Sequence, residues 1–100
     1  MESIFDGNGD QEGARKDPRL KKQLVRVYDV LAEGVWLSLN DISVLADAPE
    51  ASASARMRDL RKKKFGGFTL ETRILPHNNV YEYRLDVSSG DPERVTAPLK

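Results

Sequence analysis

A run of small and then basic side chains in the middle of the chain carries the clearest chemical signal. Residues 51–55 are all alanine or serine, and residues 56–64 hold six bases against one acid, Asp59, a balance of plus five. Small side chains let a helix backbone come close to base edges, serine hydroxyls can donate or accept there, and arginine can bind guanine through two hydrogen bonds. This composition suits contact with the bases and phosphates of a nucleic acid.

The chain as a whole is electrically neutral, which at first argues against a nucleic-acid partner because phosphates attract basic domains. The charge is unevenly distributed, however. Residues 1–17 hold five acids against Arg15 and Lys16, a balance of minus three. The basic run therefore stands out locally although the net charge is zero.

Side-chain sets that would carry out catalysis or bind a metal are missing from the sequence. Cysteine is absent, which removes disulfides and thiolate zinc sites. The single histidine, His77, has no second histidine or cysteine with which to share a metal ion. No glycine-rich phosphate loop follows a predicted strand, and no serine, histidine and aspartate constellation is suggested. We expect a protein without catalytic activity, cofactor, bound metal or small-molecule substrate.

Composition divides the chain into three parts. Glycines and polar residues dominate residues 1–17, and residues 88–100 carry two prolines, a glycine and no apolar periodicity. We therefore expect a disordered acidic tail over 1–17, one folded domain over 18–87 and a second disordered tail over 88–100. The acidic start differs from a signal peptide, and no window approaches the roughly 18 apolar residues of a membrane helix. We expect a cytoplasmic protein without membrane contact.

The first predicted helix begins where Asp17 precedes Pro18, because a carboxylate can cap a helix and proline is well tolerated in the first turn. Gly34 ends it, and residues 35–37 are β-favouring and predict a short strand. Four apolar residues fall on one stripe of the helix and are expected in the core: Leu20, Leu24, Val27 and Leu31.

Ser38 is expected to cap a second, short helix, with Asp41 three residues later forming a capping box. The sequence of residues 47–49 breaks this helix, because the residue before Pro49 is pushed out of the α region. Its expected buried face consists of Leu39, Ile42, Leu45 and Ala46.

Residues 50–64 predict a third helix, since alanine, arginine and lysine favour helices and Gly66 and Gly67 stop it. Successive side chains of an α-helix are rotated by about 100° around its axis, which places Ala53, Met57 and Leu60 on one narrow stripe that faces the core. Four residues lie on the opposite side: Ala51, Ala55, Arg58 and Lys62.

Two β-patterned runs, Thr69–Leu75 and residues 80–85, predict a hairpin closed by residues 76–79. Pairing Leu75 with Val80 makes one face apolar and matches opposite charges on the other, whereas a slip of one residue would set charges against aromatics. The cross-strand pairs in this register are Arg73 with Glu82, Glu71 with Arg84, Ile74 with Tyr81, Thr72 with Tyr83, and Leu70 with Leu85.

Three aromatic residues, Trp36, Tyr81 and Tyr83, have two interpretations. They could stack on nucleobases, as in single-strand binders. A domain of about 70 residues also needs its aromatics to close the space between its first helix and its sheet, and we expect them in the core.

The order of helix, strand, two helices and hairpin, together with three segments, resembles the winged helix-turn-helix proteins of bacteriophages and prophages, which are broadly related to MarR-like regulators. The segments are GVWLSLNDI, APEASASARMRDLRKKKFGG and VYEYRL, and the resemblance covers roughly residues 20–86. It implies an α+β fold, a three-helix winged helix-turn-helix with a short strand and a C-terminal β-hairpin wing. It also implies a duplex DNA-binding protein, of the kind that regulates transcription in a sequence-specific way. The cytoplasm in which it works would then be that of a bacterium or a phage-infected host.

Carried over to this chain, the resemblance implies that helix 50–64 enters the major groove and that the hairpin is the wing. The DNA contacts expected on the helix are Ser52, Ser54, Ala55, Arg56, Arg58 and Lys62. The wing tip would touch the neighbouring minor groove or backbone through His77, Asn78 and Asn79, and Ser38 would contact a phosphate from a helix N-terminus.

The alternative hypothesis is a winged-helix module that binds protein and not DNA. Glu50 and Asp59 are expected on or near the groove face, where a carboxylate repels phosphate, and charges of both signs alternate along the wing. The same surface could dock an acidic partner, or the domain could form a homodimer through its first helix, where Tyr28 and Val30 are spare apolar groups.

Overall fold

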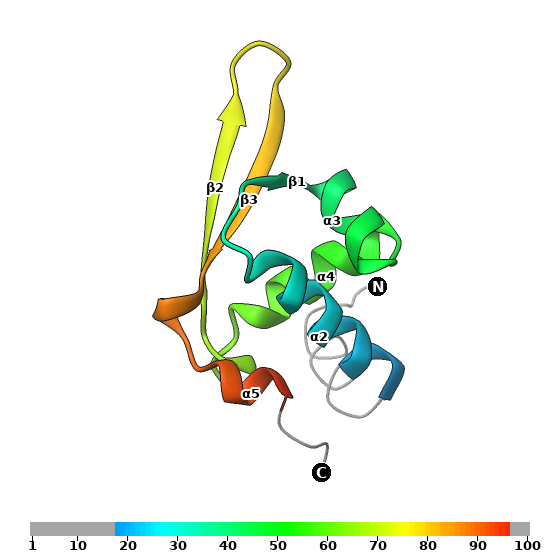
Figure 1. Ribbon diagram of the computed structural model, residues 1–100, viewed down its shortest axis with the longest axis vertical. Helices are drawn as coiled ribbons and strands as arrows, with labels where there is room; N and C mark the ends of the chain where they lie inside the picture. Colours follow the sequence, from blue (N-terminus) through cyan, green and yellow to red (C-terminus); the bar gives the residue numbers. More distant parts are fainter. Residues whose placement is uncertain (1–17, 97–100) are drawn as a thin grey trace, which may run out of the picture.

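The computed structural model describes residues 18–96, which form an α+β fold with four α-helices and a three-stranded antiparallel sheet (Figure 1). The expected tail over 1–17, including Asp17 as a helix cap, and residues 97–100 lie outside the described part. None of the helices in the described part is long and apolar enough to cross a membrane. In chain order the main elements are α2 (Pro18–Leu31), β1 (Leu37–Ser38), α3 (Leu39–Ala46), α4 (Glu50–Leu60), β2 (Thr69–Leu75), β3 (Val80–Asp86) and α5 (Pro92–Thr96).

The apolar stripe of α2 forms the centre of the core. Leu24, Val27 and Leu31 are fully buried, while Leu20 is half-buried at the start of the helix. Tyr28 adds a tilted ring contact to Phe68, with the ring centroids 5.5 Å apart. Burial, and then the neighbouring charge of Asp29, raise the pKa of Tyr28. The predicted helix and its inward face are therefore confirmed.

The capping box predicted at the start of α3 is present. The Ser38 hydroxyl accepts a hydrogen bond from the Asp41 backbone N–H at 3.1 Å, and the Asp41 carboxylate accepts one from the Ser38 N–H at 3.2 Å. At the other end Asp47 adopts a left-handed conformation with φ 55° and closes the helix. Both ends of α3 are thus determined by interactions within a few residues.

Two predictions around α3 are wrong. Leu45 is 61% exposed, because α2 and α4 cover the side of α3 that carries Ile42 and Ala46 and leave the flank with Leu45 open. The strand expected over residues 35–37 is shifted to Leu37–Ser38, and Val35 is 51% exposed. Pairing with Tyr83 and Glu82 of β3 makes the α3 cap residue Ser38 and the residue before it the strand.

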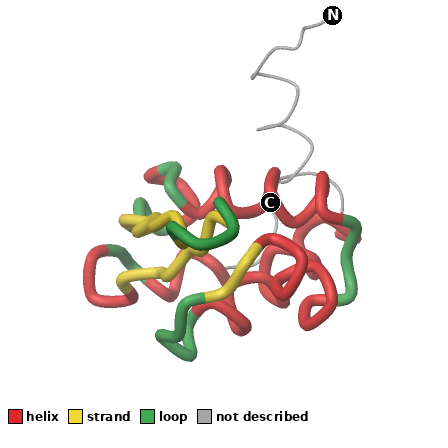
Figure 2. Tube along the Cα trace, turned by 90° about the horizontal axis from the view of Figure 1, so that it is seen from above, coloured by secondary structure: helices red, strands yellow, loops and turns green. Residues whose placement is uncertain are grey.

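The hairpin has the predicted register at every position. Leu75 pairs with Val80 and Leu70 with Leu85, and β3 continues one residue further, to Asp86 opposite Thr69. Figure 1 shows the hairpin rising beyond the helices, and the view from above in Figure 2 shows helical segments on several sides of the strands. The sheet order is β1-β3-β2.

Burial along the apolar face of the hairpin changes from its base to its tip. Leu85 is 3% exposed, whereas Ile74 is 48% and Tyr81 55% exposed. The prediction that Tyr81 lies in the core is therefore wrong, because the helices pack only against the base of the hairpin. Tyr83, nearer the base, is half-buried and packs against the core.

The prediction that Trp36 lies in the core is wrong, because this half-buried side chain packs on the charged face of the sheet. The guanidinium carbons of Arg73 and Arg84 lie 4.4 and 4.8 Å from the centre of its ring. Each arginine is also ion-paired across the hairpin at 2.7 Å, Arg73 with Glu82 and Arg84 with Glu71. Stacking and pairing together order this face while both arginines remain in contact with solvent.

The prediction that the chain beyond residue 87 is a disordered tail is wrong for residues 88–96. A short 3-10 helix (η2, Val87–Ser89) leads into α5, whose Val95 is fully buried in the core. The backbone N–H of Asp91 donates to the Gly66 carbonyl oxygen at 3.0 Å and ties this segment to the chain after α4. A single buried valine gives no periodic signal, so the sequence pattern did not reveal the helix.

Val95→Ala should lower the free energy of unfolding by about 2 kcal/mol, because it leaves a cavity in a core this small. Glu93→Ala, on the exposed side of α5, is the matched control and should change stability by less than about 0.5 kcal/mol. Urea unfolding of both variants measures the difference. Equal midpoints for Val95→Ala and the unaltered protein would show that α5 does not contribute to the fold.

Candidate nucleic-acid interface

The helix that carries the basic run is shorter than predicted. α4 ends at Leu60, Lys62 is extended with φ −78° and ψ 141°, and a 3-10 turn follows (η1, Lys63–Phe65). Phe65 and Phe68 are both buried, and the Phe68 N–H donates to the Leu60 carbonyl oxygen at 2.9 Å. The chain leaves the helix early because it must turn back to place both phenylalanines in the core.

One side of α4 is buried and includes charged residues. Ala53, Met57 and Leu60 are in the core as predicted. Arg56 and Asp59 are also buried, with 5% and 1% of their surface exposed. The predictions that Arg56 contacts DNA and that Asp59 lies on the groove face are therefore wrong, because these residues pack against neighbouring elements.

Asp59 is the centre of a buried charge network. Its carboxylate lies 2.9 Å from Arg56 Nε and 3.0 Å from Lys62 Nζ. Arg56 also reaches α2, where Nη1 donates to Gln23 Oε1 at 3.2 Å. Arg56 Nε and Asp59 Oδ2 form an ion pair whose angles do not meet those of a hydrogen bond. Neither atom has another hydrogen-bond partner within residues 18–96. The network joins α4 to α2 and uses two bases of the run.

The opposite side of α4 faces solvent and carries small residues followed by arginines. Ser54, Arg58 and Arg61 follow one another at intervals of four and three residues, so they form one stripe. Arg58 and Arg61 are exposed, and Arg58 Nη1 donates to Ser54 Oγ at 3.4 Å. Ala51 and Ala55 lie beside them. We call these five residues the α4 stripe.

Arg61 was not among the site residues expected from the sequence, although its spacing from Arg58 could have identified it. Within residues 18–96, four bases of the run take part in no ion pair: Arg58, Arg61, Lys63 and Lys64. The charge of the run is therefore available mainly at the C-terminal end of α4 and in η1.

A groove of about 250 Å³ separates the α4 stripe from the hairpin. Ser54, Arg58 and Arg61 line one wall together with Met57, and the other wall is formed by Leu70, Thr72 and Tyr83. The same hairpin face continues towards the tip with the exposed pair Ile74 and Tyr81. Arginines, hydroxyls and an aromatic ring thus border one continuous surface.

The other predicted site residues lie elsewhere or are engaged. The Ser38 hydroxyl caps α3, Lys62 is three-quarters buried against Asp59, and Ser52 is half-buried. The loop with His77, Asn78 and Asn79 is exposed at the hairpin tip, away from α4 (Figure 1). There Asn78 Oδ1 accepts from the Val80 N–H at 3.1 Å, and Asn79 has φ 57°, so both asparagines shape the turn.

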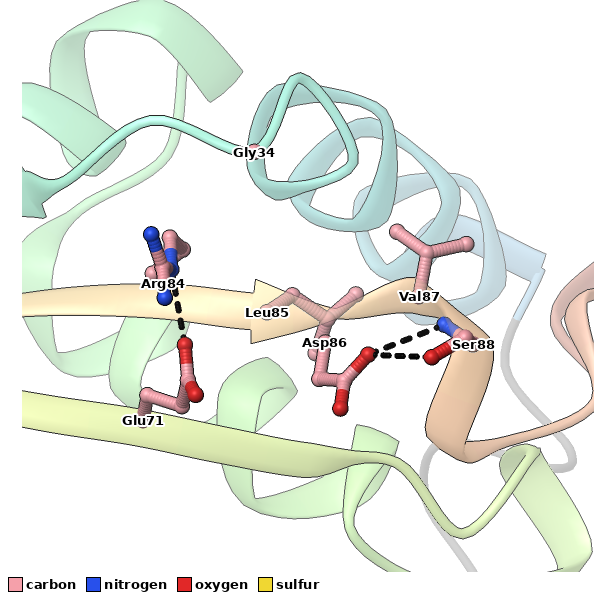
Figure 3. A pocket seen from close by; sticks show the side chains of 7 residues that line it. All are labelled: Gly34, Glu71, Arg84, Leu85, Asp86, Val87 and Ser88. Carbon is pink, nitrogen blue, oxygen red and sulfur yellow. Dashed lines mark hydrogen bonds and ion pairs between the residues drawn. The ribbon is translucent and has the colours of Figure 1, made fainter.

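A larger pocket of about 450 Å³ lies at the base of the hairpin beside Gly34 (Figure 3). Its polar side chains bind one another: Arg84 pairs with Glu71 at 2.7 Å, and the Asp86 carboxylate accepts from both the N–H and the hydroxyl of Ser88. Groups satisfied in this way hold the hairpin base together. They do not converge on an open position for a ligand.

No protein-family model matches this chain, and no match was found among the curated proteins or the solved structures. Groups of three or more histidine, cysteine or acidic residues that could hold a metal ion are also absent from residues 18–96. The function has to be inferred from the geometry of the α4 stripe and the groove beside it.

Asp59→Ala should destabilise the protein by about 3–5 kcal/mol, because it leaves the Arg56 guanidinium buried without its counter-charge. The double variant Arg56→Met, Asp59→Ala should recover part of this loss, since the deeply buried guanidinium is then removed and only the partly exposed Lys62 ammonium loses its partner. Chemical unfolding of the single and double variants gives the coupling energy. Strictly additive losses would mean that the two side chains do not depend on each other.

Proposed function

We propose that the chain is a winged helix-turn-helix protein that binds duplex DNA in a sequence-specific way, with α4 in the major groove and the β2–β3 hairpin as the wing. The observation that carries the proposal is the α4 stripe. Its N-terminal half is small enough for the backbone to approach base edges, and its C-terminal half presents Arg58 and Arg61 to base edges and phosphates.

The burial of Asp59 supports this proposal, because it removes the main electrostatic objection. A carboxylate on the helix surface would repel phosphates, but Asp59 is compensated by Arg56 and Lys62 inside the fold. Glu50 is the remaining acid on α4 and lies at its N-terminus, one helix length from Arg61. The surface that would meet DNA is therefore basic although the whole chain is neutral.

The hairpin face beside the groove suggests how the wing would contact DNA. It presents Ile74 and Tyr81 and carries no base, so its contact would rest on apolar surface against sugars or base edges in a minor groove. Arg73 is on the opposite face and is occupied by Glu82 and Trp36. Phosphate neutralisation would then come from α4 and η1 alone.

Arg58→Ala and Arg61→Ala should each weaken DNA binding about tenfold and reduce the slope of log K against log salt by about one, because each removes one phosphate or base contact. The DNA is a duplex selected from a random pool with the full chain. Affinities are measured over a series of salt concentrations by fluorescence anisotropy.

Lys22→Ala is the matched control, because it removes one positive charge from the outer side of α2, away from the α4 stripe. It should leave the salt slope unchanged. Binding that ignores salt, or that survives the double loss of Arg58 and Arg61 in a folded protein, would contradict the proposal. A selection that enriches no sequence would contradict its sequence-specific part.

Tyr81→Thr should weaken binding about fivefold while the salt slope stays constant, since an aromatic contact of about 1 kcal/mol is lost and no charge is removed. Threonine keeps the β-propensity of the strand. Val80→Thr, on the other face of the hairpin, should bind as the unaltered protein does. Equal losses in both variants would show that the hairpin face beside the groove is not the one that contacts DNA.

A further inference from the structure

An apolar cavity lies between the C-terminal end of α2, the start of β1 and α3. Its volume is about 280 Å³, and its apolar lining is formed by Val30, Val35, Leu37 and Leu45. Asp29 in the last turn of α2 and Glu33 in the turn just after that helix complete the lining. We call this the α2–α3 cavity.

The α2–α3 cavity is separate from the α4 stripe. α4 packs against α2 and α3 with its buried side, so the stripe faces away from both helices. In Figure 1 α2 lies in front of α4. A ligand in this cavity would therefore leave the α4 stripe free.

Exposure of its lining indicates that the cavity is an interaction surface. Leu45 is 61% and Val35 51% exposed, next to the partly buried Val30 and Leu37. Single exposed aliphatic residues are common on protein surfaces, but several that surround one cavity mark a contact site. The volume is at the lower end of small-molecule pockets, about 300–1,000 Å³, and would hold one or two aliphatic side chains.

We propose that the α2–α3 cavity docks an amphipathic, lysine- or arginine-rich helix of another protein. The apolar side chains of that helix would enter between Val35 and Leu45, and its basic side chains would pair with Asp29 and Glu33. Asp41, one turn before Leu45 on α3, adds a further negative charge to this side. The lining of the cavity contains no lysine or arginine, so its acids are available to a basic partner.

The same charges argue against a second copy of this chain as the occupant. A two-fold symmetric contact would bring Asp29 and Glu33 of one protomer close to the same residues of the other, and like charges repel. Residues 1–17 are equally unsuited, because their charge balance is minus three, five acids against two bases. A basic partner satisfies both the apolar lining and the acidic rim.

The test uses the full chain and two labelled 18-residue helical peptides with identical leucine stripes, one carrying lysines and the other glutamates at the remaining positions. The lysine peptide should bind and the glutamate peptide should not. Leu45→Ser and Val35→Ser should each weaken binding at least about tenfold, as expected for side chains central to a contact. Val44→Ser, at a position on α3 that is even more exposed than Leu45 but outside the lining, is the control and should bind normally.

Asp29→Asn with Glu33→Gln should reduce binding of the lysine peptide and abolish most of its advantage over the glutamate peptide. Equal binding of both peptides, no binding of the lysine peptide, or equal effects of Leu45→Ser and Val44→Ser would overturn the proposal. A dimer in analytical ultracentrifugation that Leu45→Ser converts to monomer would identify a second copy as the occupant. Leu45→Ser should retain DNA binding, so this inference and the proposed function fail independently.

Discussion

The buried carboxylate of Asp59 is the interaction on which the position of α4 depends. A charge withdrawn from water is tolerated only when opposite charges and hydrogen bonds compensate it. Arg56 and Lys62 provide that compensation, and Arg56 continues to Gln23 on α2. Because the network connects two helices and the chain after α4, it couples the orientation of α4 to the place where the helix ends. The apolar residues beside the network contribute the buried surface, and the ion pairs set the orientation of α4.

This network also decides how the basic run is divided. Arg56 and Lys62 are directed inward, whereas Arg58 and Arg61 remain in solvent beside the groove. A neutral protein can in this way present a basic surface on one side, with the acids Asp29 and Glu33 around an apolar cavity on another. The surface proposed for DNA and the surface proposed for a protein partner therefore differ in sign, so one partner would not compete with the other.

Much of the fold could be predicted because its signals are local. The capping box of Ser38 and Asp41 lies within one helical turn, and the strand register follows from alternating side chains around a four-residue loop. The inward stripes of α2 and α4 follow from helical periodicity. For the candidate site, the α4 stripe was predicted in outline: Ser54, Ala55 and Arg58 are on it, and Arg61 extends it by three residues, about one further helical turn.

What the sequence by itself determined is thus the type, order and internal pairing of most elements in residues 18–87. Only the tertiary structure decided which side chains have neighbours. Arg56 is buried and Leu45 and Tyr81 are exposed against expectation, and residues 92–96 form a helix anchored by one valine. The physical reason is that caps, periodicity and register depend on residues a few positions apart, whereas burial depends on segments that are distant in the chain and meet only after folding.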